Sequence, residues 1–178
     1  MSKRNIFVFK ALHIVAWIIF IGLSIDAGGL IVNFIFSLFK PEIVHKLYQK
    51  LDLSELLNSS KLAFFGMYGF ILAISILKAY LFYVVIMLIS KLNLSKPFNP
   101  YVAVQITKIS YFTLSIGILS NLARQIAQNL MHLGSYIDNL NQFWPDSQAY
   151  ILMAAVIYVI ATIFSRGVEI QNENDLTV

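Results

Sequence analysis

The chain has 178 residues, of which 58% are hydrophobic and 12% are charged. A composition this apolar excludes a water-soluble globular domain and an intrinsically disordered chain. The chain contains no cysteine, which excludes disulfides, thiolate metal sites and cysteine nucleophiles. The net charge of +4 comes from Lys and Arg that mostly flank apolar runs, so we expect no direct binding of nucleic acid. These features predict an integral membrane protein.

Four stretches of the chain are long enough to cross a bilayer as helices, which takes about 20 residues for a hydrocarbon core about 30 Å thick. We predict spans at about 11–39, 62–90, 102–133 and 147–167 in a single transmembrane domain, followed by a cytoplasmic tail at 168–178. The predicted fold class is therefore all-α, an integral membrane bundle of four transmembrane helices.

The connections between these spans carry helix signals of their own. Over 41–51, apolar residues recur at helical spacing with charges on the other faces, which predicts an amphipathic helix in the first outer loop. In the inner loop, Asn99 can cap a helix and Pro100 suits its first position, so the third long helix is predicted to start near Pro100. Asp146 or Ser147 is predicted to cap the fourth.

The loops also predict an orientation. With the N-terminus inside, the inner side carries more Lys and Arg than the outer side, and the last outer loop, 134–148, carries none. We therefore predict a multi-pass protein of the cell membrane with both termini in the cytoplasm. The inner set is Lys3, Arg4, Lys10, Lys91, Lys96, Lys108 and Arg166, and the outer set is Lys40, Lys46, Lys50 and Lys61.

Three of the predicted spans each contain one charged residue, Asp26, Lys78 or Arg124. A charge at the bilayer centre costs about 2.5 to 3.5 kcal/mol on insertion scales, so each needs a partner or water. Counted from the outer ends of their spans, Asp26 and Lys78 lie about one helical turn apart and are predicted to pair. Such a pair either fixes the helix register or acts as an ionisable gate or relay. A helix break at Gly28-Gly29 would instead move Asp26 toward the outer surface.

A polar stripe follows one face of the third span, and three interpretations of it stay open. It packs small and hydrogen-bonding groups against a neighbouring helix, in this chain or a second copy; it lines a polar cavity; or the span is 102–123 and Arg124 lies at the outer headgroups. The stripe comprises Ser110, Thr113, Gly117, Asn121, Arg124 and Gln128, widened by Gln125, Asn129 and His132. The candidate polar intramembrane site is Asp26, Lys78, Asn121, Arg124, Gln125 and Gln128.

Signals for catalysis or metal binding are missing from the sequence. The three histidines, His13, His45 and His132, share no ligand spacing with one another or with carboxylates. The chain also has no zinc-protease, nucleophile-elbow or glycine-rich phosphate motif. We therefore expect no metal site, no cofactor and no enzymatic activity.

The C-terminal sequence resembles the ending of a bacterial family of small four-span membrane proteins, the domain of unknown function numbered 2975. The inner loop Lys96–Pro100, the following Ile106–Lys108 and the stretch Leu51–Ser54 are similar to that family as well. The resemblance implies a bacterial inner-membrane protein, often encoded beside a small helix-turn-helix regulator, with no established activity. The residues that carry it at the C-terminus are Phe164, Arg166, Gly167, Val168 and the ending Asn174-Asp175-Leu176-Thr177.

Two functions are compatible with these features. The first is a non-enzymatic regulatory or sensory membrane component that acts with a cytoplasmic helix-turn-helix regulator, as the resemblance implies. The alternative is a small transporter or channel subunit that uses the polar stripe of the third helix. The expected partners are membrane lipids, a second copy of the chain and the cytoplasmic regulator. The acidic C-terminal tail is either a contact surface for that regulator or simply solvated chain.

Overall fold

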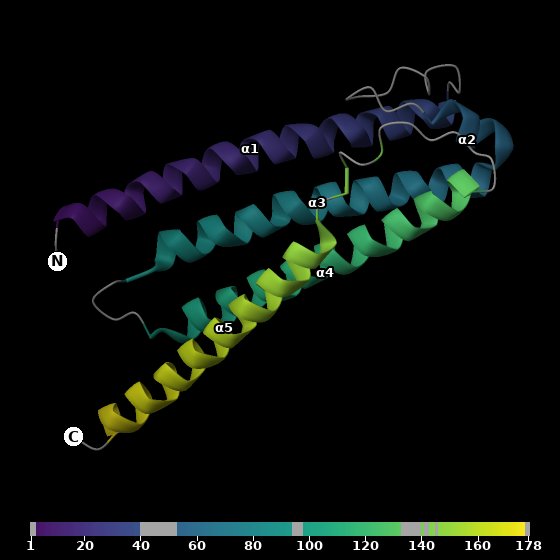
Figure 1. The fold of residues 1–178 in the computed structure, drawn as a ribbon. Helices are drawn as coiled ribbons and strands as arrows, with labels where there is room; N and C mark the ends of the chain where they lie inside the picture. Colours follow the sequence, from purple (N-terminus) through teal and green to yellow (C-terminus); the bar gives the residue numbers. More distant parts are fainter. Residues whose placement is uncertain are drawn as a thin grey trace.

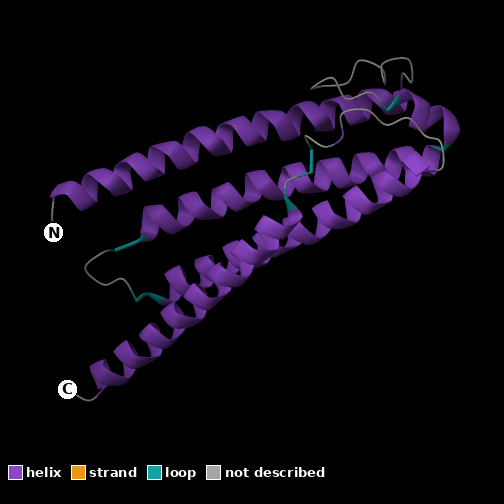
Figure 2. Cartoon of the chain, in the orientation of Figure 1, coloured by secondary structure: helices purple, strands orange, loops and turns teal. Residues whose placement is uncertain are grey.

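The computed structural model describes residues 3–39, 53–93, 98–132, 140, 143–144 and 146–176 of the chain. The described residues form helices and no strand, which confirms the predicted all-α fold (Figures 1 and 2). The predicted amphipathic segment 41–51 lies outside the described residues, and a short helix, α2, stands between the first two spans. The helices are α1 (Lys3–Phe39), α2 (Ser54–Ser59), α3 (Lys61–Lys91), α4 (Pro100–His132) and α5 (Ser147–Leu176).

Four of these helices, α1, α3, α4 and α5, are long and apolar enough to cross a membrane. Large apolar side chains cover their outward surfaces: Leu62 is 86% exposed, Phe7 is 73% exposed and Leu152 is 71% exposed. Water would disfavour apolar surface on this scale, whereas lipid tails solvate it. By helix length and hydropathy, the chain is a multi-pass membrane protein.

Local sequence signals explain where three helices begin. The Asn99 side chain accepts a hydrogen bond from the Tyr101 N–H at 2.8 Å, which confirms the predicted start of α4. Asp146 accepts one from the Gln148 N–H at 3.0 Å and caps α5, as predicted. Ser60 caps α3. By contrast, α1 runs unbroken through residues 28 and 29, so no helix break displaces Asp26.

The helices pack mainly in chain order, α1 on α3, α3 on α4 and α4 on α5, while α2 packs on α3. Both ends of the described chain therefore lie at the same end of the molecule (Figure 1). The Tyr68 hydroxyl donates to the Leu30 carbonyl oxygen at 3.1 Å, and the rings of Phe20 and Tyr83 lie 6.1 Å apart. These contacts fix the register of α1 on α3.

The register of α5 along α4 determines where the candidate site lies. The Ser110 hydroxyl donates to the Ala154 carbonyl oxygen at 2.9 Å, and Gly117 lies against Ser147, the first residue of α5. Because α4 continues to His132, it extends about 22 Å beyond the start of α5. Figure 1 shows α5 starting midway along α4. We call the place where α5 begins alongside α4, and beyond which α4 continues alone, the step.

At its other end, α5 extends past the start of α4. The Phe98 ring lies against Gly167, and its centroid is 5.5 Å from that of Phe164. Residues 170–176 therefore continue beyond the first turn of α4, over about 10 Å of helix. The predicted tail at 168–178 is thus a helical continuation of the fourth span as far as Leu176.

Candidate functional site

Asp26 on α1 and Lys78 on α3 form the centre of the candidate site. The contacts that fix the register of α1 on α3 lie on both sides of Asp26, and they place it opposite the turn of α3 that holds Lys78. Both side chains are half-buried, and the Asp26 carboxylate acts electrostatically on the Lys78 ammonium. The structure therefore brings together the two residues that the sequence predicts to pair.

After the predicted orientation, we call the end of the molecule that holds both ends of the described chain the inner end, and the opposite end the outer end. The inner half of the polar stripe on α4 is a helix-packing surface. Ser110, Thr113 and Gly117 are all buried. Ser110 donates its hydroxyl hydrogen bond to α5, and Gly117 lies in contact with Ile151. Small residues of this kind let two membrane helices approach closely. For this half of the stripe, the structure supports the packing interpretation.

The outer half of the stripe is open. Asn121, Gln125 and Gln128 are exposed, and Arg124 is half-buried. The Gln125 amide donates to the Asn121 side-chain oxygen at 3.3 Å. These residues lie outward of Gly117, beyond the start of α5, so α5 does not cover them. The late start of α5 therefore divides one helical face into a packed part and an uncovered part.

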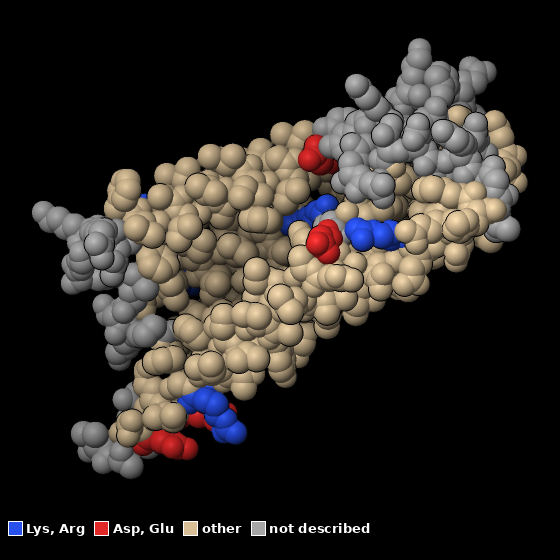
Figure 3. All heavy atoms as spheres, in the orientation of Figure 1, with Lys and Arg blue, Asp and Glu red and all other residues tan. Residues whose placement is uncertain are grey.

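Charges of both signs gather at this discontinuity. Figure 3 shows acidic and basic side chains over the middle of one face, where α5 begins, and a second group at the inner end of α5. The exposed Asp146 directly precedes α5 and adds a carboxylate whose sequence context predicts only a helix cap. We define the charged step as Asp26, Lys78, Arg124 and Asp146.

The start of α5 also marks the outer end of the apolar run in this helix. The apolar run 147–165 is about 28 Å long, which just covers the hydrocarbon core. Its outer end follows the exposed Asp146, and its inner end meets Arg166. Because Ser147 lies level with Gly117, Arg124 lies about two turns further outward. Arg124 therefore lies beyond the outer end of this apolar run, and its placement at the outer headgroups stays a prediction.

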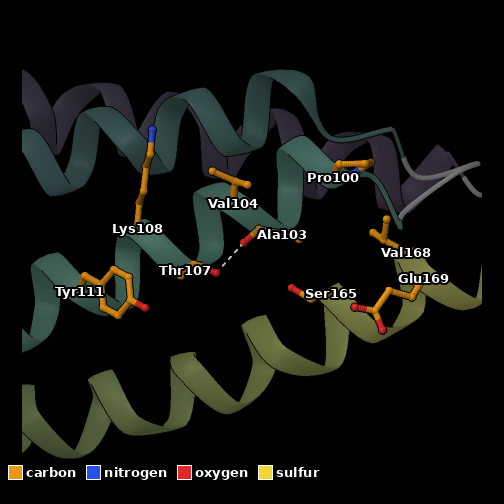
Figure 4. A pocket seen from close by; sticks show the side chains of 9 residues that line it. All are labelled: Pro100, Ala103, Val104, Thr107, Lys108, Tyr111, Ser165, Val168 and Glu169. Carbon is orange, nitrogen blue, oxygen red and sulfur yellow. Dashed lines mark hydrogen bonds between the residues drawn. The ribbon is translucent and has the colours of Figure 1, made fainter.

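A groove of about 450 Å³ lies between the inner ends of α4 and α5 (Figure 4). Three of its polar side chains, those of Thr107, Lys108 and Glu169, are engaged or turned away from it. The Thr107 hydroxyl donates to the Ala103 carbonyl oxygen, and Glu169 pairs with Arg166 at 2.6 Å. In Figure 4 the Lys108 side chain points away from α5. This groove is therefore a weaker candidate than the charged step.

In the part of the chain that the structure describes, no group of three or more His, Cys, Asp or Glu side chains is placed to hold a metal ion. The charged step instead offers two cationic and two carboxylate side chains near apolar surface. This arrangement suits ion pairing and the binding of a polar headgroup.

Comparison with known proteins finds no matching family model, curated protein or solved structure. Membership of the domain of unknown function numbered 2975 therefore stays a prediction, which is based on the C-terminal residues and the inner loop.

Proposed function

We propose that the chain is a non-enzymatic regulatory or sensory component of the inner membrane. The observation that carries this proposal is the displacement of α5, which begins at the charged step and ends beyond the start of α4. One continuous helix thus joins an outer polar site to the predicted cytoplasmic end. A movement imposed at the step would be transmitted along this helix, because a packed helix shifts as a unit.

The inner end of α5 is the proposed output surface. Glu169 and Glu173 are exposed, and the Arg166 side chain is paired with Glu169. An acidic helix end suits a partner with a basic surface, such as the helix-turn-helix regulator that the resemblance implies. In this proposal the regulator contacts nucleic acid, and the membrane chain does not.

Site-specific photo-crosslinking in intact cells tests the output surface. A photo-reactive residue in place of Glu173 is expected to capture a cytoplasmic protein that carries a DNA-binding domain. The matched control is the same residue in place of Leu152, which lies on the same helix and is 71% exposed. Identical adducts at both positions, or no protein adduct at Glu173, would contradict the proposal.

A small transporter or channel subunit is the second candidate function. The half-buried Asp26 and Lys78 favour it, since ionisable side chains that face the interior of a helix bundle often mark ion pathways. The packing of Ser110, Thr113 and Gly117 supports it less well, because in one copy of the chain these residues do not line an open polar path. If the chain has this function, proteoliposomes that contain it should show a flux of a solute or an ion. Asp26→Asn or Arg124→Ala should alter that flux while the yield of folded protein stays normal. Wild-type chain without flux under any imposed gradient would eliminate it.

A further inference from the structure

An apolar groove leads from the charged step toward the inner side of the molecule. It has a volume of about 330 Å³, within the range of about 300 to 1,000 Å³ that is usual for small-ligand sites. Figure 3 shows the face hollowed between α3 and α5, on the inner side of the central charges. The groove extends over about 12 Å of α5, from Ala149 to Ile157. Its walls include Leu81 and Val85 of α3 and Met153 of α5, and α4 supplies the floor at Ile109 and Thr113.

The lining of this groove suits a hydrocarbon chain. Its side chains are apolar except for the hydroxyls of Thr113 and Tyr150. The Thr113 hydroxyl is already engaged, because it donates to the Ile109 carbonyl oxygen at 2.7 Å. A ligand in the groove would therefore be recognised by its shape and apolar surface.

The outer end of the groove is charged. Lys78 lies one helical turn outward of Leu81 and Phe82 on α3, and Asp146 lies three residues before Ala149. An ammonium group has three donors, so Lys78 can interact with Asp26 and still donate to a ligand oxygen. An apolar groove that opens on a cation matches an amphiphile with an anionic head.

Two further donors lie toward the same end. The Ser120 hydroxyl and the Trp144 indole N–H are buried and have no hydrogen-bond partner among the residues that the structure describes. Ser120 lies about two turns outward of Thr113 on the same side of α4, and Trp144 lies two residues before Asp146. Buried donors without partners are costly. Ester and phosphate oxygens of a lipid are acceptors of the kind that would satisfy them.

We propose that this groove is a binding site for a phospholipid of the outer leaflet. One acyl chain occupies the groove between α3 and α5, and the phosphate lies at the charged step, where Lys78 and Arg124 supply the cationic groups. The depth of the charged step in the bilayer is consistent with this assignment, because the exposed Asp146 places the start of α5 near the outer headgroups. A phospholipid meets both requirements of the site, an apolar chain and an anionic head.

Tryptophan quenching tests the acyl-chain position. The chain has two tryptophans, Trp17, which is 43% exposed, and Trp144, which is 4% exposed. In a Trp17→Phe background, a phosphatidylethanolamine brominated near the carbonyl end of its acyl chain is expected to quench Trp144. Adding Ala149→Phe, which fills the groove, should lower that quenching at least threefold. Leu152→Phe, on the exposed side of the same helix, should leave it unchanged.

Absence of quenching in the Trp17→Phe protein, or equal quenching in the two further variants, would overturn the proposal. Where Ala149→Phe does not fold, Ile157→Phe at the inner end of the groove gives the same comparison. The headgroup is tested by replacing the probe with a brominated diacylglycerol, which lacks the phosphate. Lys78→Met should weaken the binding of the phospholipid about tenfold and leave the binding of the diacylglycerol unchanged. The double variant Asp26→Asn/Lys78→Met should behave like Lys78→Met alone. If Lys78→Met weakened the binding of both probes equally, phosphate recognition would be refuted.

Discussion

Gly117 is the residue at which the packing of α5 on α4 can be tested most sharply. A Cβ atom at this position would lie 2.9 Å from Ile151 Cγ1, 3.1 Å from the Ile151 nitrogen and 3.2 Å from the Ser147 carbonyl oxygen. Two of these three atoms belong to the backbone, so rotation of one side chain cannot relieve the contact. Gly117→Ala therefore requires α5 to move away from α4.

The magnitude follows from two opposing effects. Overpacking of a tight interface costs about 1 to 3 kcal/mol, and replacing Gly by Ala within a helix gains about 0.5 to 1 kcal/mol. We expect Gly117→Ala to lower the free energy of unfolding by up to about 2.5 kcal/mol. Gly69→Ala is the matched control, because nothing lies within 4 Å of its added Cβ, and it should be neutral or stabilising. The assay is helical circular dichroism during titration with sodium dodecyl sulfate in mixed micelles. Equal effects of the two substitutions would refute the close approach of α4 and α5.

Substitutions at four further residues test three other contacts in the same assay. Neutralising Asp26 or Lys78 alone should lower the free energy of unfolding by about 1 to 3 kcal/mol, and the double variant should lose less than the two single losses combined; strict additivity would show that the two charges do not interact. Tyr68→Phe removes the hydrogen bond to the Leu30 carbonyl oxygen and should cost about 0.5 to 1.5 kcal/mol, so an unchanged unfolding curve would contradict that contact. Arg166→Ala breaks only the exposed pair with Glu169 and should change stability by less than about 0.5 kcal/mol; a larger loss would mean that this pair holds α5 in place.

The features that the sequence predicts correctly are those that local chemistry determines. The four long helices follow from apolar length alone, because a membrane offers no other partner for their backbone groups. The start of α4 follows from Asn99 and Pro100, and the start of α5 follows from Asp146, since a helix cap involves only residues a few positions apart.

The register of α5 on α4 could not be predicted in this way. Helical periodicity places Ser110 and Gly117 on the same broad face as Asn121 and Gln128, yet it gives no information on how far a neighbouring helix extends along that face. Contacts between distant residues, such as that of Gly117 with Ile151, set the register. The one sequence signal was the short fourth apolar run, 147–165, which follows a long polar loop. Because this register could not be predicted, Asp146 was missing from the predicted site.

The four membrane crossings can be tested most directly by cysteine accessibility, because the chain contains no cysteine of its own. Asn58→Cys lies on the exposed side of α2, and Glu173→Cys lies at the exposed inner end of α5. A membrane-impermeant maleimide should label Asn58→Cys in intact cells and Glu173→Cys only after permeabilisation. Leu152→Cys, on the lipid-facing side of α5, should stay unlabelled in both conditions. Labelling of Asn58→Cys and Glu173→Cys from the same side of the membrane would contradict the four-span arrangement.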